Sequence, residues 1–252
     1  MCGRFVAASS PNLLAERFHV DIQRGTDGDP DYNVAPRDNI LVVRDRPDDD
    51  AVTRVLSRLR WGLVPSWAKD PAVGDRMINA RAETVATKPA YQRSFTKRRG
   101  IIPADGFYEW RRLPPEPGSS RRRTEPTFVH RRDGEPMAFA GLWAGWKVPD
   151  ELVGTVGDED GWLRSCAIVT TRANRLLAPV HDRMPVVLPE AAWDRWLDPR
   201  PDPDDDELAA LAALLVPAPD DWFEAYPVSP RVNRVVDHDA ELVRPVGDVL
   251  LP

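Results

Sequence analysis

The second residue of this 252-residue chain is a cysteine, and its position gives it a distinct chemistry. Removal of Met1 would leave Cys2 with a free α-amine and a thiol on one carbon skeleton. The amine can condense with an aldehyde to give an imine, and the thiol can then add to the imine carbon and close a thiazolidine ring. Ring closure is intramolecular, so it benefits from the high effective molarity of a tethered nucleophile. The sequence therefore predicts a nucleophile at Cys2 of a mature chain that has lost Met1.

Three further polar residues lie in segments that otherwise have the composition of a core. Asn79 and Arg81 have one residue between them in the segment 77–84, so they share one side of an extended chain. Glu109 lies among aromatic residues in the segment 106–110, where desolvation would raise the pKa of the carboxyl toward a range useful for proton transfer. A buried carboxylate that pairs with an arginine is the alternative interpretation of Glu109.

A histidine precedes an apolar run near the C-terminal third of the chain. His181 comes shortly before 186–188, which places a titratable imidazole at the entrance of an expected strand. A hydrogen-bonded structural histidine is the alternative. His19, His130 and His238 have no comparable neighbours, and we expect them to be structural.

Two tryptophans are candidates for a contact with nucleic acid. Trp61 and Trp67 flank the turn-rich stretch 62–66, where an exposed indole could stack on a base. We expect most of the nine tryptophans, including Trp143, Trp146, Trp193 and Trp196, to lie in the core.

The charge is unevenly distributed along the sequence. The chain has 34 Lys and Arg against 40 Asp and Glu, a net charge of −6. The segment 93–132 alone carries eleven basic and four acidic side chains, so the rest of the chain is strongly acidic. A basic face on an acidic protein is compatible with phosphate binding. For the basic run 121–123, a solvated loop is the alternative.

The pattern of short apolar segments predicts an α+β fold. Helices are expected at about 11–19, where Ser10 and Pro11 give an N-cap and a first-turn proline, at about 189–197 and at 206–215. Strands are expected at 40–43, 52–61, 100–103, 107–111, 127–131, 137–146, 166–171 and 185–188. Strands and helices do not alternate regularly, so we expect a mainly antiparallel, barrel-like sheet with short peripheral helices.

We expect one domain over residues 2–252. We expect loop insertions near 113–126 and 149–162 and an acidic, Pro-rich loop near 199–207. No apolar run approaches the roughly 18 residues of a membrane span, and the N-terminus lacks the pattern of a signal peptide. The expectation is a cytoplasmic protein with both cysteines, Cys2 and Cys166, reduced, and with no metal or cofactor.

Six motifs together resemble one known family, the SOS response-associated peptidase (SRAP) family. They are Met1-Cys2-Gly3-Arg4-Phe5, Tyr32-Asn33-Val34-Ala35-Pro36, Arg60-Trp61-Gly62-Leu63-Val64-Pro65, Asn79-Ala80-Arg81, Gly106-Phe107-Tyr108-Glu109-Trp110 and His181-Asp182-Arg183-Met184-Pro185. The resemblance implies a protein that recognises abasic sites in single-stranded DNA and crosslinks to them through its N-terminal cysteine. The crosslink would shield the lesion from cleavage.

The resemblance also implies a role for each matching residue. Cys2 matches the nucleophile, and Asn79 matches the residue that positions the backbone and amine of that cysteine. Glu109 matches the acid/base that assists opening of the sugar ring, and His181 matches the residue that moves protons during imine formation and reversal. Contacts with DNA are implied for Arg4, Arg81, Arg183 and Trp67. The two insertions depart from the family pattern and leave the extent of the DNA groove open.

Three hypotheses remain open at this stage. The first is abasic-site crosslinking through a thiazolidine, with a possible lyase activity through the imine, self-reversal, and action as a monomer bound to DNA at the nucleoid. The second is a thiol peptidase in which Cys2 attacks a peptide carbonyl with His181 or Glu109 as base. The third is a module that binds single strands without chemistry. The first alone requires an aldehyde on the DNA.

Overall fold

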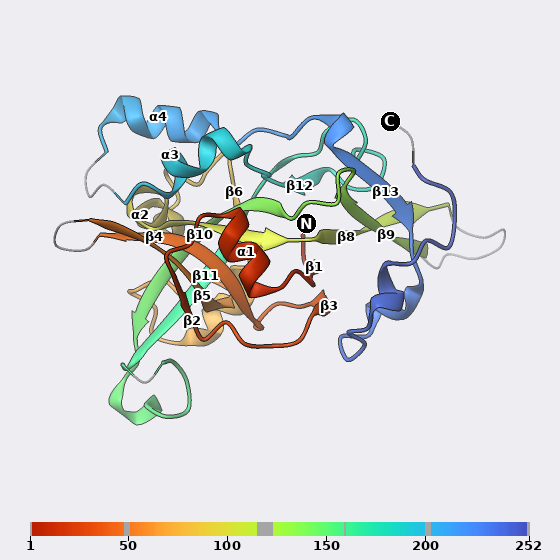
Figure 1. The fold of residues 1–252 in the computed structure, drawn as a ribbon. Coiled ribbons are helices and arrows are strands. Elements are labelled where there is room, and N and C mark those ends of the chain that lie inside the picture. Colours follow the sequence, from red (N-terminus) through yellow and green to blue (C-terminus); the bar gives the residue numbers. More distant parts are fainter. Residues whose placement is uncertain (1, 48–50, 115–122, 159, 200–202, 251–252) are drawn as a thin grey trace.

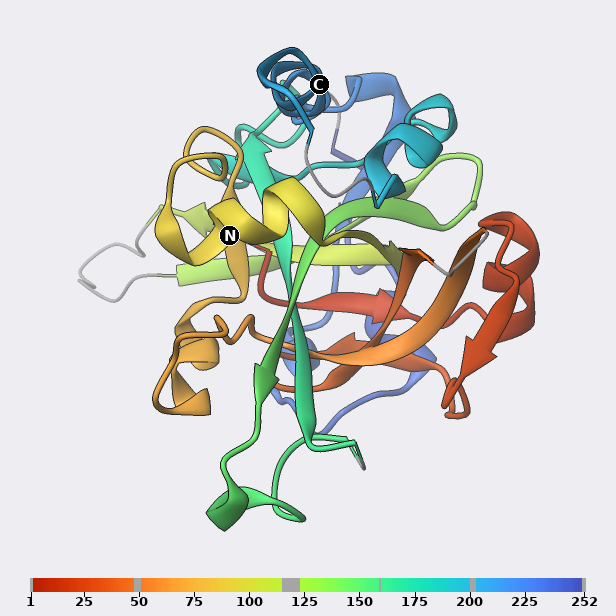
Figure 2. The ribbon, with the colours of Figure 1, turned by 90° about the vertical axis from the view of Figure 1, so that its left-hand side faces the viewer.

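A closed barrel forms the centre of the molecule. The computed structural model describes residues 2–47, 51–114, 123–158, 160–199 and 203–250. Five of the described strands form the barrel: β4 (Asn39–Pro47), β5 (Val52–Trp61), β7 (Arg99–Ala104), β10 (Met137–Lys147) and β11 (Trp162–Arg172). Neighbours in the order β5, β4, β7, β10, β11 pair antiparallel, and a parallel pairing of β11 with β5 closes the ring. The hairpin between β10 and β11 extends well beyond the other strands (Figure 2).

Short strands extend the barrel sheet at its margins, and a second sheet packs against it. The short strands are β2 (Ile22–Arg24) beside β5, and β6 (Asn79–Arg81) and β12 (Arg183–Pro185), both beside β11. The second sheet has the order β13 (Phe223–Pro227), β9 (Arg123–Arg131), β8 (Gly106–Leu113), β1 (Phe5–Ala7) and β3 (Asp31–Val34). The N-terminal strand therefore lies inside a sheet, between β8 and β3, with a partner on each side.

Helices are short and cover one side of the barrel (Figure 1). They are α1 (Pro11–Arg17), α2 (Pro89–Lys97), α3 (Trp193–Leu197) and α4 (Asp205–Ala213). The first begins as expected, because the Ser10 side chain accepts a hydrogen bond from the Leu13 amide. The last is capped in the same way by Asp204, which accepts from the amide of Glu207.

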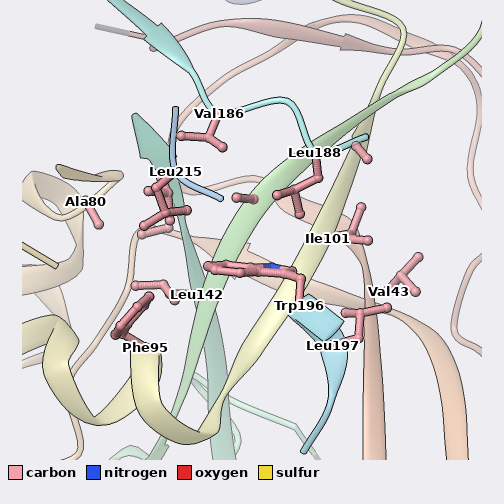
Figure 3. Close-up of a cluster of buried hydrophobic side chains, with 14 of the residues drawn as sticks. Val43, Ala80, Phe95, Ile101, Leu142, Val186, Leu188, Trp196, Leu197 and Leu215 are labelled. Carbon is pink, nitrogen blue, oxygen red and sulfur yellow. The ribbon is translucent and has the colours of Figure 1, made fainter. Parts of the chain in front are cut away.

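The two faces of the barrel strands belong to two different apolar clusters, because side chains alternate along a strand. One face packs under the helices, and Figure 3 shows Trp196 of α3 and Phe95 of α2 against Leu142 and Ile101. The opposite face shares a cluster with the second sheet. The second cluster contains Cys2, Phe5, Val42, Leu59, Trp61, Ile102, Phe107, Phe139, Cys166 and Ile168. Cys2 is thus part of the core.

The predicted fold class, with a mainly antiparallel barrel and short peripheral helices, is confirmed. One strand boundary was wrong. The segment predicted at 185–188 contains β12 only at Pro185. Beyond it, the Val186 N–H still donates to Val169 of β11, while the Val186 carbonyl and the Leu188 N–H bond to Ala140 and Ala138 of β10. The helix α2 was not predicted at all, since its hydrophilic exposed face obscures the buried Tyr91 and Phe95.

The expected insertions are only partly described. Residues 115–122 of the first, residue 159 of the second and residues 200–202 of the acidic loop lie outside the described residues. The described part of the second contains a 3₁₀ turn at Asp150–Leu152. No described helix has the length and apolar character needed to cross a membrane.

Close packing of β8 makes Gly106 sensitive to substitution. A Cβ added at Gly106 would lie 2.2 Å from two ring carbons of Phe128 and 2.9 Å from the Val129 carbonyl oxygen. We therefore expect Gly106→Ala to lower the free energy of unfolding by about 1–3 kcal/mol, the usual cost of overpacking. Urea unfolding measures this change. The control is Gly247→Ala, whose added Cβ would lie 3.4 Å from Pro227, an ordinary contact. Equal stabilities of the two variants would contradict the packing argument.

Candidate active site

The N-terminal segment is fixed by strand pairing up to the candidate nucleophile. In β1, Phe5 pairs with Phe107 of β8, and the Tyr108 amide donates to the Arg4 carbonyl at 3.0 Å. Cys2 is fully buried at the end of this pairing. Burial and the nearby charge of Glu109 raise the pKa of the Cys2 thiol well above its ordinary value. The thiol is therefore protonated at neutral pH.

Asn79 holds Cys2 from the other sheet. Parallel pairing of β6 with β11 places Asn79 beside Ile168, and its Nδ2 donates to the Cys2 carbonyl at 2.8 Å. The Tyr91 hydroxyl donates to the Asn79 carbonyl at 2.9 Å and so holds β6 to α2. The Oδ1 of Asn79 is buried and makes no hydrogen bond with the described residues, so it can accept one from a group at the N-terminus.

Glu109 faces the cluster that contains Cys2. It lies two residues after Phe107 on β8, so both side chains point to the same face of that strand. The Glu109 side chain is 4% exposed, and desolvation raises the pKa of its carboxyl, while the nearby His181 opposes the shift. This is the direction expected from the aromatic neighbours of Glu109. A carboxyl with a raised pKa can act as a general acid nearer neutral pH.

His181 lies in the turn that leads into β12. Its Nδ1 is 3.0 Å from the backbone nitrogen of Arg183 and 2.9 Å from Oδ1 of Asp182. An amide N–H can only donate, so the neutral ring accepts at Nδ1 and carries its proton on Nε2. After protonation of Nδ1, the ring can donate to Asp182 instead. Nδ1 of His181 thus lies near both an amide N–H and a carboxylate oxygen.

The arginines implied as DNA contacts differ in what already binds them. Arg4 donates to Asn33 Oδ1 at 2.8 Å and to the Val232 carbonyl at 2.9 Å. Arg183 donates to both oxygens of Glu83 and to a backbone carbonyl, and it is mostly buried. Arg81 is exposed at the end of β6, with no ion pair among the described residues. Arg81 thus has a guanidinium fully available to a phosphate.

Trp67 and Trp61 have opposite environments. The Trp67 side chain is 63% exposed, whereas Trp61 is fully buried with its indole N–H bonded to the Ile78 carbonyl at 3.0 Å. Of the two tryptophans that flank 62–66, only Trp67 presents a face to a ligand. Trp146, Trp193 and Trp196 are buried, as expected for core residues.

Basic residues of the segment 93–132 have several separate functions in the fold. Arg99 is buried and donates to backbone carbonyls, including those of Phe95 and Trp196. Arg111 pairs with Glu125 across the β8–β9 hairpin. Arg93 is exposed. The net positive charge of the segment therefore does not form one continuous face, and residues 121–122 lie outside the described residues.

Four residues contribute to the site that sequence reasoning did not single out. Asn33 holds Arg4 and donates to three backbone carbonyls of the C-terminal segment, and Glu83 fixes Arg183. Tyr91 fixes β6. Thr127 is fully buried opposite Glu109 on β9, and its hydroxyl has no hydrogen-bond partner among the described residues. The long sequence separations of these contacts explain why spacing alone gave no signal.

The fold and the site define a class of protein, a barrel that holds a cysteine from its own N-terminus beside an amide, a carboxyl and an imidazole. A model of the family described as SOS response associated peptidase (SRAP) matches residues 1–235. This chain belongs to that family. The resemblance expected from the six motifs is therefore confirmed.

Relatives and solved structures agree with this assignment. The abasic site processing protein YoqW of Bacillus subtilis is 40% identical over 246 residues, which cover 96% of this chain and 99% of the relative. The abasic site processing protein YedK of Escherichia coli is 34% identical over 252 residues, 98% of this chain and 100% of the relative. A crystal structure of a protein from Bacteroides thetaiotaomicron matches with a TM-score of 0.75 at 21% identity, covering 97% of this chain and 100% of that one, which shows the common fold.

The raised pKa of Glu109 predicts how stability depends on pH. The folded chain binds this proton more tightly than the unfolded chain, so stability from Glu109 is greatest in acid. It is lost as the pH rises from the ordinary value of a Glu to the raised value, by up to about 1.4 kcal/mol per pH unit. Glu109→Gln should lack this loss. Urea unfolding at several pH values measures it, with exposed Glu151→Gln as the matched control. If wild type and Glu109→Gln differed by a constant at every pH, Glu109 would not titrate as inferred.

Proposed function

We propose that this protein processes abasic sites in single-stranded DNA by forming a covalent crosslink through Cys2 once Met1 is removed. The observation that carries the proposal is the 2.8 Å hydrogen bond from Asn79 Nδ2 to the Cys2 carbonyl. That bond fixes the backbone of the residue that would carry both nucleophiles. The printed names of relatives such as YoqW and YedK describe abasic site processing and support the same activity.

The protonation states favour a reaction in which the amine attacks first. The raised pKa of the Cys2 thiol keeps the sulfur protonated, whereas an α-amine has an ordinary pKa near 8 and is partly neutral at neutral pH. The amine attacks the aldehyde carbon of the opened sugar, and loss of water gives an imine. The thiol then adds its sulfur to the imine carbon and its proton passes to the nitrogen. The product is a thiazolidine.

Glu109 and His181 supply the proton transfers in this proposal. An abasic sugar is mostly a closed hemiacetal, so a proton must reach the ring oxygen before the aldehyde forms. Glu109 keeps its proton to higher pH than an exposed carboxyl and is the candidate acid. His181, with Arg183 N–H and Asp182 as its partners, assists as water leaves and, in the reverse direction, as the crosslink opens.

DNA would lie across Arg81 and Trp67. Arg81 lies on the same strand as Asn79 and offers an exposed guanidinium to a phosphate. Trp67 offers an exposed indole for stacking. Arg4 and Arg183 contribute positive charge, but their hydrogen bonds to Asn33 and Glu83 also fix the local backbone. We further propose that the protein acts as a monomer in the cytoplasm, associates with the nucleoid when bound to DNA, and has lyase activity through the imine.

A thiol peptidase is the second candidate, and the environment of Cys2 disfavours it. A peptidase of this type needs a thiolate, which an imidazolium or other cation must stabilise. Burial and the charge of Glu109 act on Cys2 in the opposite direction. A binding module without chemistry is the third candidate, and it would not account for a buried carboxyl beside a buried N-terminal cysteine.

The covalent step makes a prediction for each residue. Cys2→Ala should abolish the stable adduct while leaving an imine that borohydride traps, because the amine survives the substitution. Glu109→Gln should slow crosslinking by about 10²–10⁴-fold, the usual contribution of general acid–base catalysis. His181→Ala should impair formation and reversal together. A denaturing-gel time course with abasic single-stranded DNA measures all three.

Intact mass spectrometry and a blocked N-terminus provide the controls for crosslinking. Mature protein should have lost one Met residue, and its mass should rise by that of the abasic strand less one water. A tag on the N-terminus should prevent the adduct while leaving the thiol in place. A tagged protein that forms the heat-stable adduct at the normal rate would exclude the thiazolidine and favour the peptidase.

The assignment of the DNA contacts predicts a preference for single strands. Trp67→Ala should weaken binding by about 1–3 kcal/mol, the value of one base–aromatic stack. Arg81→Ala should reduce the slope of log affinity against log salt by about 0.7, since one phosphate contact is lost. Fluorescence anisotropy measures both, and the partly exposed Trp162 gives the matched control Trp162→Ala. Equal affinity for blunt duplex would show that the groove is assigned wrongly.

A further inference from the structure

One face of the barrel strands changes from apolar to cationic near the hairpin of β4 and β5. Val42 of β4 belongs to the cluster that contains Cys2. Arg44 and Arg46 follow at two and four residues, so they point to the same face. On β5, Val55 lies opposite Arg44 and Thr53 lies opposite Arg46. The cationic face therefore involves both strands of the hairpin.

The neighbouring strand β2 completes a small hollow on this face. In its parallel pairing with β5, Ile22 lies beside Val55 and Arg24 lies beside Ser57. A hollow of about 100 Å³ lies here. Its lining consists of Ile22 and Arg24 of β2, Arg46 and Pro47 of β4, and Thr53 and Val55 of β5. Two guanidiniums and a hydroxyl thus surround a space of the size of a small ion.

Arg44 is buried beside the hollow, and its hydrogen bonding is incomplete. The residue is 6% exposed, and its Nη2 donates to Ser57 Oγ at 3.0 Å. Its guanidinium carbon lies 4.8 Å from the ring centroid of Trp143, which Arg98 also contacts, at 5.2 Å. The Nε of Arg44 is buried and has no hydrogen-bond partner among the described residues. A buried charged group in this state is costly unless an anion or acceptor is near.

Of the three arginines that act on Arg44, Arg164 is paired with Asp158 and Asp160, whereas Arg24 and Arg46 have no ion pair with the described residues. Desolvation and the charges of Arg164, Arg46 and Arg24 lower the pKa of Arg44 to about 10, against one opposing contribution from Asp158. Asp158 is itself hydrogen-bonded to Arg164 at 2.5 Å. Arg24 and Arg46 are exposed and form no ion pair with the described residues. Among the described residues that line the hollow, two are cationic and none is anionic.

A larger cleft on the surface differs from the hollow in how its arginines are paired. It has a volume of about 940 Å³ and is lined by Arg37, Arg60 and Asp75, among other residues. Both of these arginines form ion pairs with Asp75. Arg37 and Arg60 thus share one carboxylate, whereas Arg24 and Arg46 of the small hollow form no ion pair with the described residues.

We propose that the hollow between β2, β4 and β5 binds one tetrahedral phosphate oxyanion. Arg24 and Arg46 would hold it by charge-assisted hydrogen bonds, Thr53 would donate its hydroxyl, and Arg44 would supply charge from beneath. The anion is either a free phosphate or a phosphate of a DNA backbone, since both present the same oxygens. The site differs from the candidate active site, because none of Cys2, Asn79, Glu109 and His181 lines the hollow.

The test uses inorganic phosphate at constant ionic strength, with chloride as the replaced anion. We expect phosphate to raise the Tm of wild type, because a ligand that binds the folded state stabilises it. The double variant Arg24→Ala/Arg46→Ala should bind phosphate at least about tenfold more weakly, since two charge-assisted contacts are lost. Both residues are exposed, so the variant keeps its fold, and its Tm without phosphate checks this. Arg244→Ala, an exposed arginine of the C-terminal segment, is the control for loss of charge alone.

A second arm identifies the source of the phosphate. Anisotropy with an undamaged single strand that lacks terminal phosphates measures DNA binding by the same variants. A lower affinity and a smaller salt slope in the double variant assign the site to the DNA backbone, and unchanged DNA binding assigns it to a free phosphate. Crosslinking at saturating abasic DNA should be normal in the double variant. This measurement therefore distinguishes a failure of the phosphate site from a failure of the proposed Cys2 chemistry. No Tm rise in wild type, or an equal rise in the double variant, would overturn the proposal.

Discussion

The hydrogen bond from Asn79 to the Cys2 carbonyl joins the second sheet to the margin of the barrel. Cys2 belongs to the chain that enters β1 in the second sheet, and Asn79 belongs to β6 at the margin of the barrel. A free N-terminus usually frays, because its first residues lack partners. Here strand pairing with β8, burial of the cysteine and the amide of Asn79 act together, so the chain end is fixed inside the core. Every other group of the site is useful only because this end is fixed.

Burial sets the chemistry of the site by favouring neutral groups. Desolvation raises the pKa of both the Cys2 thiol and the Glu109 carboxyl, so each keeps its proton at a pH where an exposed group loses it. A protonated thiol is a poor first nucleophile, and a protonated carboxyl is a useful acid. The same low polarity therefore disfavours thiolate catalysis and favours a route that begins with the α-amine. In the proposed mechanism, partly exposed His181, with an amide N–H and a carboxylate oxygen near Nδ1, would exchange protons with solvent.

Local sequence predicted the elements of this fold better than it predicted their contacts. Strand β5 matched its expected range, and α1 matched because Ser10 and Pro11 are local signals. The strand expected at 185–188 overlaps β12 only at Pro185, because an apolar run does not say where regular strand pairing ends. In the site, the burial of Glu109 followed from its aromatic neighbours. The bond of Arg183 to Glu83 could not be predicted from the local sequence, because the two residues are distant in sequence and either could have faced solvent.

The arginines illustrate why charge counts alone do not locate a binding surface. Arg99 is buried and fully engaged with backbone carbonyls, so it fixes α2 and α3 to the barrel and offers nothing to a ligand. Arg4 and Arg183 combine a structural bond with proximity to the site. Arg81 is exposed and unpaired among the described residues. The cluster around Arg44 holds Arg24 and Arg46, which form no ion pair with the described residues, beside Arg164, which pairs with two aspartates. Since like charges repel most strongly where water is excluded, such a cluster persists in a fold only if an anion offsets it or if packing, as of Arg44 on Trp143, outweighs the repulsion. Phosphate-dependent stability separates these two causes, because packing against an indole is indifferent to the anion in solution.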